Sequence, residues 1–135
     1  MLCGAAGIMT DISKNFSRNE FACPCGCGFN TVDAELLSVL QNEIRNYYGQ
    51  PITILSGCRC FQHNLSTPGA ARNSLHIEAK ATDIQIPGVS PRAIYHYLNK
   101  RFPTKYGLGL YSNRIHIDVR PFPARWNMTD LPFPA

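Results

Sequence analysis

The sequence predicts an α+β fold, in which a small antiparallel sheet is flanked by helices. Two segments have the apolar periodicity of amphipathic helices, and several shorter segments have the composition of strands. Their order is helix, strand, long loop, strand, helix, strand, strand. A chain of 135 residues, 44% hydrophobic and 16% charged, suffices for one globular core. We therefore expect one domain over residues 16–135, preceded by a disordered or poorly ordered tail over residues 1–15.

The two predicted helices carry recognisable start and stop signals. Thr31 is the expected N-cap of the first helix, whose apolar residues recur at helical spacing until Gly49 closes it. The second helix starts with Ser90 as N-cap and Pro91 at the first helical position, and it ends near Phe102. Both helices therefore offer an apolar face to a common core.

Three strands are predicted from short apolar or alternating segments, at Ile52–Leu55, Ala81–Ile86 and Arg114–Val119. Residues 56–74 are expected to form a long loop, because they are rich in Gly, Pro, Asn and Ser. Loops of this length in a compact domain are usually functional.

The C-terminal part is predicted from its glycines and prolines. Gly107 and Gly109 indicate a tight turn into a short strand at Leu110. The tail after Arg120 contains four prolines and Trp126, and we expect it to wrap over the surface.

Charge and hydropathy give no sign of a nucleic-acid or membrane partner. The net charge is +4, and the 13 basic residues are spread along the chain without a run of like charge. This distribution suits weak attraction to anionic surfaces such as cell wall, but it is not a nucleic-acid-binding stripe. No segment approaches the roughly 18 apolar residues of a membrane span. We expect a monomer that binds neither nucleic acid nor membrane.

A candidate metal site is formed by residues from two predicted strands and the loop before them. Asp83 lies between apolar strand positions, where an ionised carboxylate needs a partner such as a cation. His76 precedes it by seven residues, and His116 shares the polar face of another strand with Asp118. Two imidazoles and one carboxylate with an open fourth position are the ligand pattern of catalytic zinc.

An arginine directly after the first strand is a candidate substrate-binding residue. Arg59 stands in Ser-Gly-Cys-Arg, where its guanidinium could hold a substrate carboxylate through two hydrogen bonds. The remaining histidines, His63 and His96, are expected to be ordinary core or surface residues.

The six cysteines do not follow a common structural zinc pattern. They stand at positions 3, 23, 25, 27, 58 and 60, with C-x-C spacing in place of C-x2-C. A disulfide between the two clusters, or free thiols in a tight loop, is favoured over a second metal site. Thiolates one residue apart chelate a metal with poor geometry.

Several motifs together resemble one known peptidase family. The motifs, in chain order, are F-A-C-P-C-G-C-G, I-T-I-L-S-G-C-R, S-L-H-I-E-A-K-A-T-D and G-L-G-L-Y…R-I-H-I-D-V-R…A-R-W. They look like those of the zinc D-Ala-D-Ala carboxypeptidase and hedgehog-type peptidase family, in its short phage-endolysin or murein-endopeptidase-like branch. The resemblance covers roughly Phe16 to Trp126 and implies the family's fold.

The resemblance also implies roles for individual residues. His76, Asp83 and His116 match the family's zinc ligands, Arg59 matches its substrate-binding arginine, and Ser74 matches the serine that lines the same cleft. The implied cofactor is Zn²⁺, which activates a water molecule and polarises the scissile carbonyl while a nearby base takes the proton.

Two positions depart from the family pattern. Ala79 replaces the glycine of H-x-x-G, which would strain the turn if its φ angle is positive. Asn113 stands where several members place an acidic base, three residues before the third ligand. Asp118 is the best replacement as a catalytic residue, although it could equally orient a ligand or Arg120. Glu78 is a poorer candidate for the base.

The resulting prediction is a zinc metallopeptidase that hydrolyses D-amino-acid-containing bonds of peptidoglycan stem peptides, as a carboxypeptidase or an endopeptidase. The alternatives are a zinc-binding module without turnover and a phage structural protein. The first nine residues make a poor signal peptide. We therefore expect an enzyme that reaches the cell wall by phage delivery or on release at lysis.

Overall fold

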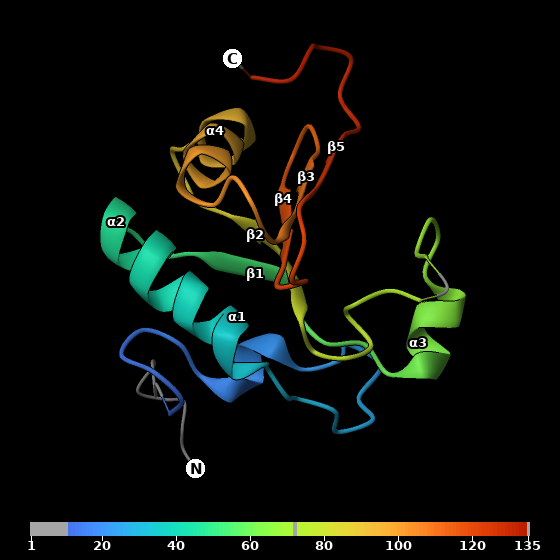
Figure 1. Cartoon of the computed structure of the whole chain (residues 1–135). Helices are drawn as coiled ribbons and strands as arrows, with labels where there is room; N and C mark the ends of the chain where they lie inside the picture. The colour runs from blue at the N-terminus through green and yellow to red at the C-terminus, as the bar shows by residue number, and fades with distance from the viewer. Residues whose placement is uncertain (1–10, 72, 135) are drawn as a thin grey trace.

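The fold is a five-stranded sheet with helices packed on one face (Figure 1). The computed structural model describes residues 11–71 and 73–134. The strand order is β1-β2-β4-β3-β5. The strands are β1 (Thr53–Ser56), β2 (Ala81–Gln85), β3 (Gly107–Leu110), β4 (Ile115–Asp118) and β5 (Ala124–Asn127). The predicted small α+β fold is confirmed: the first four strands pair antiparallel, and only β5 runs parallel to its neighbour β3.

The helical elements include two close to those predicted. They are η1 (Arg18–Phe21), α1 (Ala34–Ser38), η2 (Val39–Arg45), α2 (Asn46–Tyr48), α3 (Phe61–Ser66) and α4 (Pro91–Arg101). α1, η2 and α2 follow one another without a break, and η2 has π-type hydrogen bonding. None of the helices in the described ranges is long and apolar enough to cross a membrane.

The helix ends follow the predicted chemistry, with one correction. The N-cap of α1 is Asp33 and not Thr31, because the Asp33 carboxylate accepts hydrogen bonds from the backbone N–H groups of Glu35 and Leu36. Gly49 ends α2 with φ 64°, in the left-handed conformation that glycine adopts without strain. α4 begins as predicted, with the Ser90 hydroxyl accepting from the backbone of the first turn.

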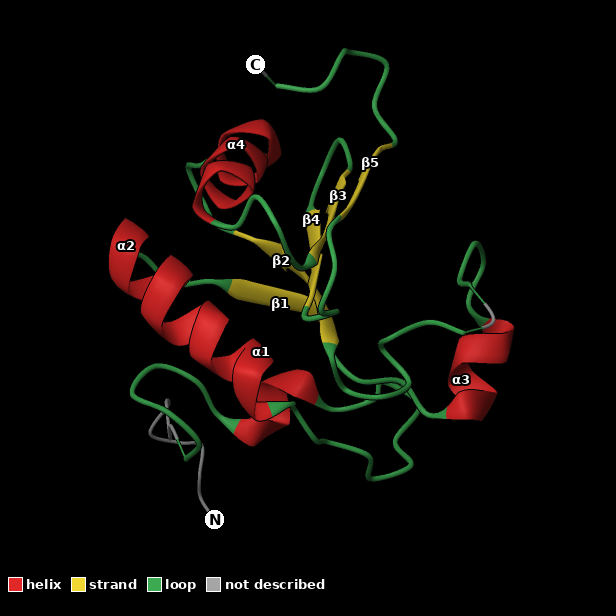
Figure 2. Ribbon diagram, in the orientation of Figure 1, coloured by secondary structure: helices red, strands yellow, loops and turns green. Residues whose placement is uncertain are grey.

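The core lies between the sheet and two helical segments. The segment from α1 to α2 and helix α4 lie on one side of the sheet (Figure 2). Buried side chains from these helices meet alternate residues of the strands; they include Leu36, Leu40, Ile44, Ile94, Leu98, Ile84, Leu108, Ile115 and Ile117. Because successive strand residues point to opposite faces, the residues between these apolar ones face away from the helices. That second face carries the polar residues described below.

Three segments that were predicted to be irregular contain regular structure. The loop predicted over residues 56–74 contains α3. Gly107 and Gly109 lie within β3, not in a tight turn, and the tail with Trp126 forms β5. Glycine in a strand often marks a place where another group approaches the backbone closely. The polar face of the sheet shows such approaches at both glycines.

The N-terminal tail lies partly outside the described residues, which begin at Asp11. Ser13 and Asn15 hydrogen bond to the side chain of Gln41, in η2, at 2.8 Å each. The predicted domain boundary at residue 16 stays a prediction.

Ala79 adopts the left-handed backbone conformation that its position in the turn before β2 requires. Its φ is 59° and it is 3% exposed. We expect Ala79→Val to lower the free energy of unfolding by about 2 kcal/mol or more, because a β-branched side chain is strained at positive φ and overpacks a buried site. Ala79→Gly is the control and should stay within about 1 kcal/mol of the wild type, since it relieves strain but loses one buried methyl group. Urea denaturation measures both. A Val variant as stable as the wild type would contradict the strained turn.

Candidate metal centre and substrate cavity

An open cavity of about 670 Å³ lies on the polar face of the sheet. Its wall includes the six residues that the sequence favours for the site: Arg59, Ser74, His76, Asp83, His116 and Asp118. The structure therefore brings together residues that are spread over sixty positions of the chain, counted from Arg59 to Asp118 inclusive.

Strand register places two of the candidate ligands side by side. In the β2–β4 ladder Asp83 stands directly opposite His116, and side chains of directly paired residues lie on the same face. His116 Nδ1 is 3.2 Å from Asp83 Oδ1. His76, in the turn that leads into β2, has its Nε2 3.6 Å from the same oxygen. One potential ligand atom from each of the three residues lies within 4.8 Å of the others.

Each histidine is held by a hydrogen bond on the ring nitrogen that points away from this cluster. His76 Nδ1 lies 2.7 Å from the carbonyl oxygen of Gly57, and a carbonyl can only accept, so Nδ1 carries the proton. The Nε2 atom of His76 is then left with its lone pair. His116 Nε2 lies 2.7 Å from Asp118 Oδ2, which leaves Nδ1 of His116 to face Asp83. This arrangement is typical of metal-binding histidines, and the donor set fits zinc.

Asp118 is completely buried, and both of its carboxylate oxygens are engaged. Oδ1 accepts from the backbone N–H of Gly107 and from the backbone N–H and Nε of Arg120. Oδ2 accepts from Arg120 Nη2 and pairs with His116. Burial alone would raise the pKa of Asp118, but hydrogen bonds from His116 and Arg120 outweigh it and hold this pKa well below its usual range. A carboxylate so engaged is suited to orienting His116.

Asp83 is ionised in a buried position. Burial alone would raise its pKa, but the hydrogen bonds with His116 and His76 outweigh burial and keep the pKa of Asp83 well below its usual range. The Arg59 and Arg114 guanidinium groups approach its second oxygen at 3.8 Å each. A buried anion at the floor of an open cavity is a suitable ligand for a cation.

Two glycines of β3 make room for this arrangement. A Cβ atom at Gly107 would collide with the Asp118 carboxylate, and one at Gly109 would collide with the Trp126 ring. The Trp126 ring centroid lies 5.0 Å from that of His116, and Trp126 Nε1 donates to the Tyr111 hydroxyl at 3.1 Å. Trp126 and Tyr111 were not predicted to line the cavity. The signal for them in the sequence was the alternation of glycine in Gly107-Leu108-Gly109, which makes room for neighbouring side chains.

Arg59 and Ser74 form part of the cavity wall. Arg59 is 9% exposed; its Nη1 donates to Asn64 Oδ1 at 2.9 Å, and its backbone N–H donates to the His76 carbonyl. The Ser74 hydroxyl oxygen accepts from the backbone N–H of His76 at 3.1 Å. Both residues therefore contact the segment that carries His76.

The candidate bases differ in their access to the cavity. Within the described ranges, the carboxylates that line it are those of Asp83 and Asp118. Glu78 lies outside the lining, 3.9 Å from Lys80 Nζ. His63 does line the cavity, from α3, although the sequence predicted an ordinary histidine there.

Comparison with known proteins gives one finding. A family model described as peptidase M15 matches residues 14–118. This range includes the six site residues predicted from the sequence, from Arg59 to Asp118, and it ends at Asp118. No curated protein and no solved structure was found to match.

Proposed function

This chain belongs to the peptidase M15 family, and from that premise we propose that it is a zinc metallopeptidase that cuts D-amino-acid-containing bonds of peptidoglycan stem peptides. Family membership makes the chain a peptidase, and therefore a hydrolase. The observation that carries the finer proposal is the convergence of His76, Asp83 and His116 at one wall of an open cavity.

In the proposed site, His76 Nε2, His116 Nδ1 and one Asp83 oxygen hold the zinc ion. When bound, zinc supplies a Lewis acid that lowers the pKa of water and polarises a carbonyl. Asp118 acts as a positioning residue, because its hydrogen bond to His116 Nε2 leaves Nδ1 free to bind the metal. We favour this role over the role of base, since both Asp118 oxygens are already engaged.

The charge of the cavity wall supports an anionic peptide as the substrate. Arg59 and Arg114 both line the cavity, and Arg114 lies over the Tyr111 ring with its Cζ atom 3.9 Å from the centroid. Guanidinium groups bind carboxylates through paired hydrogen bonds. Stem peptides carry such carboxylates. The Ser74 hydroxyl accepts from His76 N, so its proton can be donated to a substrate carbonyl.

Replacing Arg59 by lysine is expected to lower kcat/KM by about 10- to 100-fold, or roughly 1.4–2.8 kcal/mol. A lysine ammonium cannot reproduce the planar guanidinium that reaches both Asn64 and the cavity. Zinc content should not change. The matched control is Arg101→Lys, at a surface arginine paired with Glu43. Steady-state kinetics on a purified muropeptide measure the effect, and full activity of the Arg59 variant would make Arg59 a structural residue.

The function itself is tested by mass analysis of purified muropeptides after incubation with zinc-loaded protein. Loss of a terminal D-Ala indicates a carboxypeptidase, whereas conversion of cross-linked dimers to monomers indicates an endopeptidase. One observation favours a second candidate, a zinc-binding module without turnover: Asn113 stands where several members of the family place an acidic base. Full zinc loading without any product would support that candidate and contradict a peptidase acting on these substrates.

A further inference from the structure

A second cluster of metal-binding side chains lies at the edge of the cavity, and it does not include the histidines. The sulfur atoms of Cys23, Cys25, Cys27 and Cys60 all lie within 4.8 Å of one another. Cys25 Sγ is 3.5 Å from Cys23 Sγ and 3.6 Å from Cys60 Sγ. We propose that these four thiolates bind a structural zinc ion, which joins the loop over residues 23–27 to the start of α3.

The sulfur positions suit a tetrahedral ion better than a disulfide. Zinc–sulfur bonds of about 2.3 Å at tetrahedral angles place the sulfur atoms about 3.8 Å apart. A disulfide needs a separation of about 2.05 Å and joins only two sulfurs. The described cysteines are all free, and four of them surround one point. A soft tetrahedral set of four thiolates selects zinc or iron.

The loop conformation explains how cysteines with C-x-C spacing can converge. The backbone N–H of Gly26 donates to the Cys23 carbonyl, and the N–H of Cys23 donates to the Phe29 carbonyl at 2.7 Å. Gly26 and Gly28 have φ angles of 81° and 94°, which glycine adopts without strain. The chain therefore folds back on itself and gathers its sulfurs. The C-x-C spacing, which disfavours a metal site on sequence grounds, is therefore compatible with four converging sulfur atoms.

Backbone hydrogen bonds to the sulfur atoms support their role as thiolate ligands. The N–H of Cys60 donates to Cys23 Sγ, and the N–H of His63 donates to Cys60 Sγ, at 3.4 Å each. Cys58 is different, because its buried Sγ lies 3.1–3.2 Å from the carbonyl oxygens of Phe21 and Phe29 and must donate to them as a neutral thiol. Cys58 is thus a control cysteine that is not expected to bind the metal.

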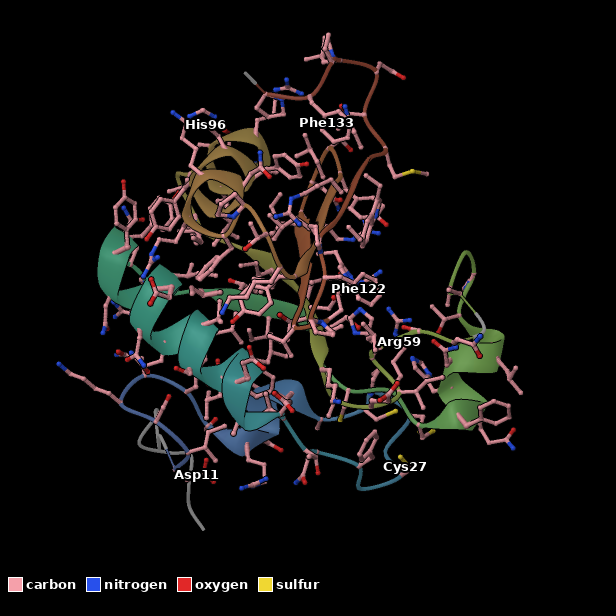
Figure 3. The ribbon with its side chains drawn as sticks, in the orientation of Figure 1. Asp11, Cys27, Arg59, His96, Phe122 and Phe133 are labelled. Carbon is pink, nitrogen blue, oxygen red and sulfur yellow. The ribbon has the colours of Figure 1, made fainter. Side chains whose placement is uncertain are left out.

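The ion would stabilise one wall of the cavity. Cys60 directly follows Arg59, and Pro24 lies between the first two cysteines; both Arg59 and Pro24 line the cavity. Figure 3 shows Cys27 and Arg59 on the side of the molecule that carries α3. Asn64, which binds Arg59, belongs to α3. A zinc ion here would fix α3, and through it Arg59, relative to the loop.

The test compares the metal content of reduced full-length protein with that of three variants. We expect about two zinc ions per chain in the wild type and in Cys58→Ser, and about one in Cys25→Ser/Cys27→Ser. The variant His76→Ala/His116→Ala should also keep about one zinc ion, the one bound by the cysteines. The two double variants together therefore distinguish the two sites. If the peptidase site binds no zinc, the histidine variant will match the wild type while the cysteine variant still loses its ion.

Cobalt substitution of the wild type provides a readout that needs no variant to fold. Tetrathiolate Co²⁺ has an intense sulfur-to-metal charge-transfer band. In a separate measurement, the bound ion should block alkylation of the four cysteines until a strong chelator is added. His76→Ala/His116→Ala should keep the band, and Cys25→Ser/Cys27→Ser should lose it. Absence of the band in the wild type, or unchanged zinc in the cysteine variant, would overturn the proposal.

Discussion

Replacing both His76 and His116 by alanine is expected to abolish zinc binding in the cavity and to lower turnover by at least about 10³-fold. The two imidazoles provide two of the three proposed ligands, and Asp83 alone cannot hold the ion tightly. A metal ion's Lewis acidity is worth several kcal/mol in the transition state, so its loss removes most of the rate enhancement. Elemental analysis and kinetics on a muropeptide measure the two effects.

The control for this experiment is His96→Ala, because His96 lies in α4 and does not line the cavity. Zinc should be counted in the Cys25→Ser/Cys27→Ser background, where an ion bound by the cysteines cannot hide the loss. In that background, a full equivalent of zinc after both histidines are replaced would refute the assignment of the ligands.

Replacing Asp118 by asparagine is expected to weaken zinc binding by about 10- to 100-fold while leaving the fold intact. The amide is nearly isosteric, and its oxygen can still accept from Gly107 and Arg120. An amide nitrogen beside His116 Nε2, however, favours the tautomer that carries the proton on Nδ1. That proton occupies the atom that should bind zinc, so affinity falls.

Zinc titration with activity read at saturation distinguishes the two roles of Asp118. If Asp118 positions His116, excess zinc should restore turnover. If it is the base, turnover should stay about 10²–10⁴-fold lower even at saturation. Asp130→Asn is a matched control, since Asp130 lies in the C-terminal segment outside the cavity lining. An Asp118 variant with normal zinc affinity and normal turnover would exclude both roles.

Much of the site could be predicted because its signals are local. The alternation of residues 114–119 put His116 and Asp118 on one strand face, and the structure has them paired at 2.7 Å. The prediction of the peptidase family is confirmed by the match over residues 14–118. Ser90 and Pro91 placed the start of α4 correctly, since capping depends on neighbouring backbone groups.

The candidate ligands and the helix-forming segments could be identified from short stretches of the sequence. Apolar periodicity and the residues that start and stop helices act over only a few positions. The tertiary structure alone decided which strands are neighbours, and hence that Asp83 faces His116. It also decided that the oxygens of Asp118 are occupied by Arg120 and Gly107. Gly107 and Gly109 were predicted to form a turn, but they lie in a strand and leave space for the side chains of Asp118 and Trp126 from neighbouring strands. Likewise, the convergence of Cys60 with cysteines more than thirty residues earlier depends on how two loops pack, which spacing along the chain does not encode.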